Sequence, residues 1–180
     1  GLLIEGYSRP YYGMNYNPPY YKALFESYGF VVQYEQISNK IDLKGSFPER
    51  FNKIANWVAK RKGNSFEYLQ KKHFDKYAQD FLDIYNDGWK DFDNFSPLTY
   101  ATIRESFDKM KPILDEKLIW FAYVNGDPAS FVMILPDTNE LIEGLDGKLG
   151  LFGKLTFVWN KVTVRHKRMR AVIMGTKEKY

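Results

Sequence analysis

The sequence predicts an α/β protein organised as α+β layers, with helices flanking a mixed, mostly antiparallel central sheet. Several segments repeat apolar residues at spacings of three and four, which is typical of helices with one buried side. Two apolar runs surround Asn125-Gly126, a dipeptide that favours the type I′ turn of a β-hairpin. Because this hairpin falls between predicted helices, the elements come in mixed order, which indicates separate layers of helix and sheet.

The composition is that of a folded chain and excludes several chemistries. Aromatic residues make up 18% of the 180 residues, which argues against disorder because disordered chains are poor in them. Cysteine is absent and the two histidines are His73 and His166, so disulfides, thiolate sites and His-rich metal sites are excluded. Without an apolar run of membrane-spanning length or a signal peptide, we expect a cytoplasmic protein that makes no membrane contact.

An N-terminal helix is predicted after Asn17, whose side chain can cap it. Pro18 and Pro19 suit the first turn, where their missing N–H groups cost nothing. Gly29 ends the helix at a position that favours a left-handed residue. Residues 30–37 follow with β-branched and aromatic side chains, so we expect a strand there.

A connector helix is predicted next, between two larger parts of the chain. Ser46 and Glu49 have the spacing of a capping box at its start, and Gly63 stops it. Residues 65–70 then alternate like a strand. Residues 74–85 carry a wide apolar stripe, so this next helix must face a core.

The remaining elements include the hairpin. Thr99 caps a helix that Pro112 kinks or ends. The hairpin, residues 118–135, is apolar at nearly every position, so we expect other elements to cover both of its faces. The pattern of residues 151–162 predicts a short amphipathic helix, and that of residues 169–176 predicts the last strand.

Carboxylates on the predicted helix at 74–85 and just after it are candidates for chemistry. Asp80, Asp83 and Asp87 could hold a metal or act as acid and base, but acidic residues usually line exposed faces, and we interpret them so. Asp91 and Asp93 alternate as in a calcium loop, yet the glycine and terminal glutamate of that loop are missing. We therefore expect no metal site.

The histidines and tyrosines give weak functional signals. His73 precedes a helix and could cap it or face solvent, and His166 stands among basic residues that disfavour its protonation. The many tyrosines could stack on bases, but most have helical spacing, which favours core packing. The chain has no phosphate-binding P-loop and no G-x-G-x-x-G motif.

Positive charge is concentrated in residues 161–179, which hold seven Lys or Arg residues and one Glu within a chain of net charge +4. Such a segment is either a solvated loop leading into a strand or a site for an anionic partner, such as nucleic acid or phosphate. The second alternative needs Arg165, Lys167, Arg168 and Arg170 on one surface, with Met169 pointing inward between neighbours. We favour the solvated loop and regard nucleic acid as the less expected partner.

Four local sequences, "IYNDGW", "FSPLT", "VNGDPASFVMILPDTN" and "AVIMGTKEKY", resemble a bacterial GNAT-like acyltransferase family whose members are roughly twice this length and carry two GNAT-like halves. The matching residues are Tyr85, Asn86, Trp89, Pro97, Leu98, Asn125, Gly126, Pro136, Asp137 and Asn139. The order strand, two helices, hairpin, helix, strand from Ser65 to Thr176 also resembles the first half of the GNAT fold. The chain departs from the family before Pro97, where "DFDN" stands in place of a Trp-Gly pair.

The N-terminal "ALFESYGF" is similar to a late GNAT motif, with Leu24, Gly29 and Phe30 in place. The tyrosine that serves many GNAT enzymes as general acid would fall at Phe25, which has no ionisable group. Tyr28 lies on a different part of the helix surface. This copy of the motif is therefore not expected to protonate a departing thiolate.

The resemblance implies a division of the chain into three parts. Residues 1–45 would close a first GNAT-like half, residues 46–63 would connect, and residues 64–180 would open a second half. Either the two pieces are parts of a broken tandem, or the early piece completes the late one in a permuted sheet. Closure of this kind, or a homodimer, would cover the last strand, which otherwise exposes an apolar edge.

The resemblance also implies the cofactor, acetyl-CoA or another acyl-CoA, and a parent activity that transfers an acyl group to an amine. The strand edge at Met174, Gly175 and Thr176 would pair with the pantetheine arm. The R-x-x-G-x-G/A loop that binds the pyrophosphate is not in the sequence, so we expect this chain to be inactive alone. Neither a catalytic base nor the acceptor amine can be named. A non-catalytic module that binds an anionic partner through residues 161–179 is the alternative.

Overall fold

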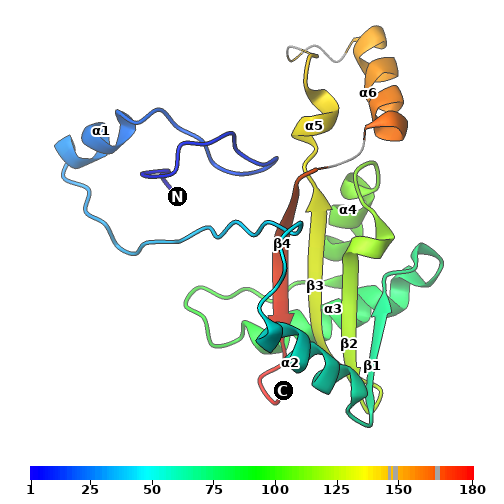
Figure 1. Cartoon of the computed structure of the whole chain (residues 1–180). Helices are drawn as coiled ribbons and strands as arrows, with labels where there is room; N and C mark the ends of the chain where they lie inside the picture. Colours follow the sequence, from blue (N-terminus) through cyan, green and yellow to red (C-terminus); the bar gives the residue numbers. More distant parts are fainter. Residues whose placement is uncertain (146, 148–149, 165–166) are drawn as a thin grey trace.

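The protein is described by a computed structural model that covers residues 1–145, 147, 150–164 and 167–180. It contains one open antiparallel sheet of four strands in the order β1-β2-β3-β4 (Figure 1). The strands are β1 Asn64–Tyr68, β2 Ile119–Val124, β3 Asp127–Pro136 and β4 Met169–Thr176. The predicted α+β class is therefore confirmed.

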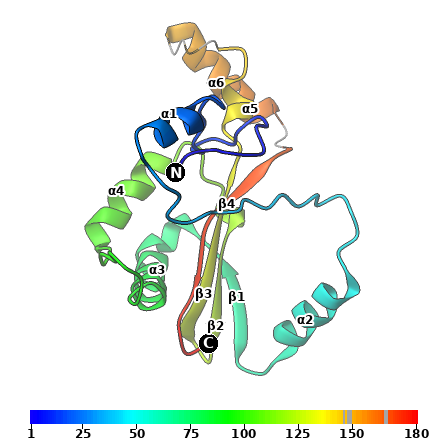
Figure 2. The same ribbon diagram turned by 90° about the vertical axis from the view of Figure 1, so that its left-hand side faces the viewer.

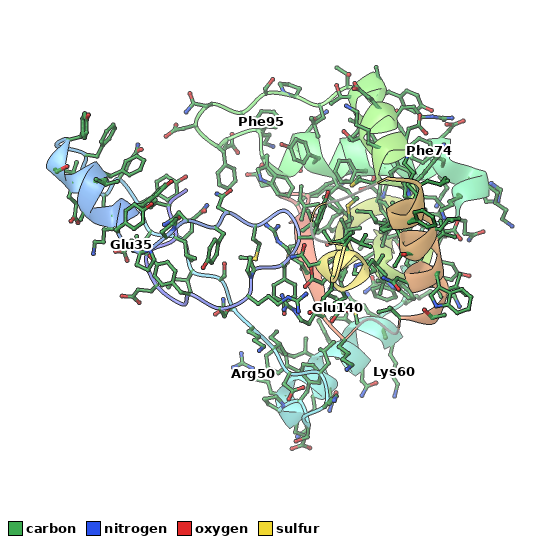
Figure 3. The ribbon with its side chains drawn as sticks, turned by 90° about the horizontal axis from the view of Figure 1, so that it is seen from above. Glu35, Arg50, Lys60, Phe74, Phe95 and Glu140 are labelled. Atoms are coloured by element: carbon green, nitrogen blue, oxygen red, sulfur yellow. The ribbon has the colours of Figure 1, made fainter. Side chains whose placement is uncertain are left out.

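Helices lie on both sides of the sheet and beyond one of its ends. They are α1 Tyr21–Ser27, α2 Glu49–Lys60, α3 Phe74–Gly88, α4 Tyr100–Met110, α5 Asn139–Ile142 and α6 Leu151–Thr163, with short 3₁₀ turns at Lys71–His73 and Glu116–Leu118. Figure 2 shows α3 and α4 on one side of the strands and α2 on the other. Seen from above, Arg50 and Lys60 of α2 lie on the opposite side of the molecule from Phe74 of α3 (Figure 3). Within the described residues, no helix has the length and apolar character needed to cross a bilayer.

The hairpin forms as predicted. β2 and β3 pair in antiparallel register from Val124–Asp127 at the turn to Ile119–Met133 at the far end. Asn125 and Gly126 have φ values of 51° and 83°, and this pair of positive angles is the requirement of a type I′ turn. β4 runs antiparallel beside β3, so the hairpin and the last strand belong to one sheet.

Aromatic rings from α3 pack on the inward face of the hairpin and form the centre of the core. The Phe81 and Phe131 ring centroids lie 4.5 Å apart, and those of Tyr77 and Phe121 lie 5.2 Å apart. α4 joins this layer through Phe107, while Ile84 of α3 is fully buried. The buried residues of the cluster are Leu69, Tyr77, Phe81, Ile84, Phe107, Leu114, Ile119, Phe121, Tyr123, Phe131 and Met133.

The other face of the sheet is open, which corrects the expectation that both faces of the hairpin would be covered. Trp120 is 41% exposed although its neighbour Phe121 is 2% exposed, because successive side chains of a strand point to opposite faces. Tyr68 packs its ring against Trp120, with the two centroids 5.8 Å apart, and Met174 is 63% exposed. α2 lies on this side without burying its own apolar residues.

The N-terminal segment departs most from the sequence predictions. The strand expected at residues 30–37 is wrong, since these residues are irregular and exposed. Asn17 does not cap α1, because its amide is occupied with Leu3, whose backbone N–H donates to Oδ1 at 2.7 Å. Pro48 stands at the N-cap of α2, so the capping box predicted from Ser46 does not form. Within the described residues the early piece adds no strand to the sheet, so the permuted closure is not observed.

Substitutions at adjacent positions of β2 should separate the covered face from the open one. We expect Phe121→Ala to lower the free energy of unfolding by about 3–5 kcal/mol, because it leaves a cavity under α3. Trp120→Ala should cost only about 1–2 kcal/mol, since its ring is already partly hydrated. Equilibrium urea unfolding followed by circular dichroism measures both, and equal losses would mean that the Trp120 face is covered as well.

Candidate functional site

The predicted cofactor contacts lie at the end of β4, which is an edge strand. Gly175 pairs with Phe131 of β3 and Thr176 pairs with Ser130, whose hydroxyl donates to the Gly175 carbonyl at 2.8 Å. Among the described residues no strand pairs with the outer side of β4. The backbone groups of Met174 and its neighbours on that side are therefore available to an extended ligand.

A bulge interrupts β4 at Val172, two residues before Met174. Met133 pairs with Ile173 and Ile134 pairs with Ala171, so Val172 has no residue opposite it on β3. A bulge of this kind leaves the extra residue outside the regular ladder and bends the strand locally. Val172 is 42% exposed, so an approaching ligand can reach this irregular stretch of backbone.

The end of α3 presses closely on the same part of β4. A Cβ atom on Gly175 would lie 2.3 Å from Cζ3 of Trp89 and 3.2 Å from Cε1 of Phe131. A Cβ atom on Gly88 would lie 2.8 Å from the carbonyl oxygen of Thr176. Both glycines are therefore needed for the close approach of helix and strand. The Trp89 ring lies against Gly175 and so fixes the position of the candidate site relative to α3.

The residues that follow β4 fold back onto the hairpin turn. Lys177 and Lys179 place their ammonium groups 3.2 Å and 2.9 Å from the Asp127 carboxylate, and the Tyr180 hydroxyl donates to it at 3.0 Å. The Lys179 hydrogen bond, followed by those of Lys177 and Tyr180, lowers the pKa of Asp127 to about 2. A carboxylate held ionised in this way is a weak base, so Asp127 serves the structure of the tail.

Asp83 and Asp87, two of the candidate carboxylates on α3, are also engaged. The backbone N–H of Glu178 donates to Asp87 at 2.8 Å and Lys90 lies 3.2 Å from it, which together lower the pKa of Asp87. Asp83 accepts a hydrogen bond from Gln79 at 2.8 Å. These residues border a shallow depression beside the tail. Both carboxylates lie toward the surface, as predicted.

Asp80 differs, because it belongs to a partly buried polar network rather than an exposed face. Tyr123 donates to Asp80 at 2.6 Å, Lys76 donates to Glu67 at 2.7 Å, and Tyr77 donates to Glu67 at 3.0 Å. Burial and then the Glu67 hydrogen bond raise the pKa of Tyr77 to about 12, and burial with Asp80 raises the pKa of Tyr123. The Lys76 hydrogen bond lowers the pKa of Glu67.

This network lies at the β1–β2 side of the sheet, whereas the candidate cofactor contacts lie at the opposite edge on β4. Sequence reasoning missed it, since two of its members come from separate strands. No cluster of His, Cys, Asp and Glu within the described residues has the geometry to hold a metal ion. His73 is exposed at the start of α3 and makes no capping hydrogen bond there.

A second polar cluster joins the N-terminal loop to the far end of β3. The buried Asp137 accepts hydrogen bonds from the backbone N–H groups of Tyr12 at 2.9 Å and Asn139 at 3.2 Å. Its other oxygen lies 2.9 Å from Arg168 as an ion pair that lacks hydrogen-bond alignment. The Arg168 guanidinium also lies 4.2 Å from the centroid of the Tyr11 ring. The cluster therefore attaches the N-terminal loop around Tyr12 to the end of the sheet, although the two are far apart in sequence.

Other residues that carry the family resemblance also have structural roles. The Asn86 side chain accepts a hydrogen bond from the Leu98 N–H at 3.0 Å and donates to the Leu98 carbonyl at 3.2 Å. This pair of bonds fixes the loop between α3 and α4. Phe25, at the position of the GNAT general acid, lies on α1, which stands apart from β4 in Figure 1. The early motif and the candidate cofactor contacts are therefore not brought together.

Carboxylates neutralise part of the basic segment among the residues that the structure describes. Arg168 is paired with Asp137, and both lysines of the C-terminal tail are paired with Asp127. Met169 is 40% exposed, so it does not take the inward position that the anionic-partner alternative needs. Arg165 and His166 lie outside the described residues.

Comparison with known proteins gives two relatives that align with the whole chain. The chain is 32% identical over 184 aligned residues to the bacterial ceramide synthase of Caulobacter vibrioides and 27% identical to protein YghO of Escherichia coli. It covers 47% and 46% of these proteins, so it spans about half the length of the curated relatives it matches. No family model matches the chain. The names of these relatives support a relationship of the chain to acyltransferase-type proteins.

Gly175→Ala should test the contact between α3 and β4. We expect a loss of about 1–3 kcal/mol in the free energy of unfolding, because the added methyl group overlaps the Trp89 ring. In a Trp89→Ala background the same substitution should cost less, since the overlapping ring is gone. Urea unfolding of the four chains gives the coupling energy, and strictly additive losses would contradict the contact.

Asp127 should contribute to stability in a defined pH range. Its pKa is lower in the folded chain than its ordinary 3.8, so the ionised group stabilises the fold above that value, and this contribution disappears as the pH falls through about 2. The effect should stay below about 1 kcal/mol because the side chain is 38% exposed. We expect Asp127→Asn and Lys179→Gln to flatten the dependence of the melting temperature on pH in this range. An unchanged slope in both variants would contradict the assignment.

Proposed function

We propose that this chain supplies part of a CoA-dependent N-acyltransferase of the GNAT type, with the edge of β4 as its contact for acyl-CoA. The observation that carries the proposal is the sheet itself, in which a strand, two helices and a hairpin lead to β4, an edge strand with no partner on its outer side in the part of the chain that the structure describes. The relative named ceramide synthase, aligned along the whole chain, supports the same reaction class.

The proposed reaction moves an acyl group from sulfur to nitrogen. The neutral amine attacks the thioester carbonyl, the C–N bond forms and the C–S bond breaks, and the proton lost by the amine balances the departing thiolate. A ceramide is an amide of a fatty acid and a long-chain amino alcohol, so we propose a lipid amine as acceptor. Backbone N–H groups of β4 between Val172 and Gly175 would stabilise the oxyanion that develops on the carbonyl.

We assign no side chain to the role of general base. Asp87 and Asp127, near the end of β4, both have lowered pKa values because donors surround them, and the nearby Glu178 is paired with Lys90. A group with so low a pKa removes protons from an amine inefficiently near neutral pH. The base, like the acceptor pocket, is therefore proposed to lie elsewhere in the complete enzyme.

Binding of acyl-CoA to this chain alone is proposed to be weak. A pantetheine arm can pair with β4 as an added strand, because main-chain hydrogen bonds give this mode its affinity. The pyrophosphate, in contrast, needs a cradle of backbone N–H groups at a helix N-terminus, and the sequence has no R-x-x-G-x-G/A loop. Isothermal titration with acetyl-CoA should thus give no sub-micromolar binding.

Amide hydrogen exchange should locate the cofactor contact. With acetyl-CoA in large excess we expect slower exchange for residues 172–176 and no change in β1, which is the other edge of the same sheet. Adenosine 3′,5′-bisphosphate, which lacks the pantetheine arm, serves as the matched control and should protect neither strand. Equal protection of both edges, or of β4 by the control nucleotide, would refute the pantetheine contact.

A further inference from the structure

Helix α6 presents large apolar side chains to solvent along most of its length. Six of its thirteen residues are apolar and 60–82% exposed. They are Leu151, Phe152, Leu155, Val158, Trp159 and Val162. Figure 1 shows α6 at the periphery of the molecule, beside α5 and away from the sheet. An exposed apolar surface of this kind usually marks a contact with a partner or a membrane.

The exposed residues share one side of the helix. At about 100° per residue they occupy an arc of about 120°, which is the width of a complete apolar face. The opposite side faces α5, where the Asn160 amide donates to the Leu141 carbonyl at 2.9 Å. The helix is therefore attached to the protein through the side opposite its apolar stripe. Within the described chain no element covers the apolar side.

The border of the apolar side is cationic, and its hydroxyl groups are already satisfied. Lys154 and Lys161 lie along one border of the stripe, the helix has no acidic residue, and neither lysine has an ion-pair partner among the described residues. On the other border the Thr156 hydroxyl donates to the Phe152 carbonyl at 3.0 Å, and Thr163 donates to Trp159 at 2.9 Å. These hydroxyls need no water, which lowers the cost of moving them into an apolar medium.

We propose that α6 lies flat in the surface of an anionic lipid bilayer, with its apolar side among the acyl chains and its lysines at the phosphate groups. This proposal replaces the expectation from the sequence that the chain makes no membrane contact. An apolar stripe with Trp, Phe and Leu, bordered by lysine, is the pattern of interfacial helices. Thirteen residues are too few to span a membrane, which takes about 20. Charge favours lipid over a second copy of this chain, because pairing two α6 helices would bring like charges together. The proposal does not depend on the acyltransferase activity.

Vesicle flotation with the full chain tests the proposal. We expect binding to vesicles of phosphatidylcholine and phosphatidylglycerol, and much weaker binding to phosphatidylcholine alone. Leu155→Gln with Trp159→Gln should reduce the partition coefficient at least about tenfold, because both side chains enter the bilayer. The matched control is Ile54→Gln with Trp57→Gln on α2, which are also exposed apolar residues and should have no effect.

A second variant, Lys154→Glu with Lys161→Glu, tests the role of charge. It should weaken binding to the anionic vesicles by about tenfold or more, and it should leave the weak binding to neutral vesicles unchanged. Equal binding to both kinds of vesicle, or an equal loss in the α2 control, overturns the proposal. So does self-association of the wild-type chain in sedimentation equilibrium that the α6 variants abolish, since a second copy would then cover the helix.

A local probe keeps the test valid if a glutamine variant does not fold. The chain has no cysteine, so Val162→Cys gives a unique site for an environment-sensitive fluorophore. Its emission should shift to the blue on anionic vesicles, whereas the same label at Ile54→Cys on α2 should not respond. No shift at either site, or an equal shift at both, overturns the proposal.

Discussion

The contact between the aromatic side of α3 and the inward face of the β2–β3 hairpin determines where the other parts of the structure lie. Phe81 meets Phe131 in this layer, and Phe131 is paired across the ladder with Gly175. Trp89, one turn beyond Tyr85 in a stacked pair of rings, then rests on Gly175. The position of the edge strand is therefore a consequence of core packing. The Trp89 ring sets the distance between β4 and the end of α3. A ligand that pairs with β4 therefore binds a strand whose position this ring fixes.

Burial on one side only explains the distribution of polar groups around the sheet. The covered side ends in the Glu67–Tyr123 network at the β1 edge, where buried hydroxyls need acceptors and lysine needs carboxylates. At the β4 edge the tail places lysines on Asp127. Both edges are also tied to α3, through Asp80 at the β1 side and through Asp87 at the β4 side. The accessible directions toward β4 are thus its outer edge and the open apolar face, where Val172 and Met174 are exposed.

The elements that the sequence predicted correctly are those with local causes. The type I′ turn depends on two adjacent residues, Asn125 and Gly126, and α3 depends on its own periodicity. The strand expected at residues 30–37 failed because β-branched residues favour a strand only when another strand pairs with them. The Asp80 network could not be predicted, since Tyr123 lies 43 residues from Asp80 and Glu67 belongs to a different element from Lys76. The cofactor edge rests on a resemblance, because no local pattern marks an unpaired strand.

Helix α6 shows the limit of periodicity as a guide to burial. Its apolar stripe was predicted from sequence, and such a stripe ordinarily faces a core. Here the stripe faces outward, because Asn160 directs the opposite side toward α5 and α6 lies beyond the end of the sheet. The periodicity of apolar residues shows which side of the helix is apolar. Tertiary contacts then decide whether that side faces a protein core, water or other surroundings. Where two lysines and no acid border that side, the medium that matches both its apolar area and its charge is an anionic lipid surface.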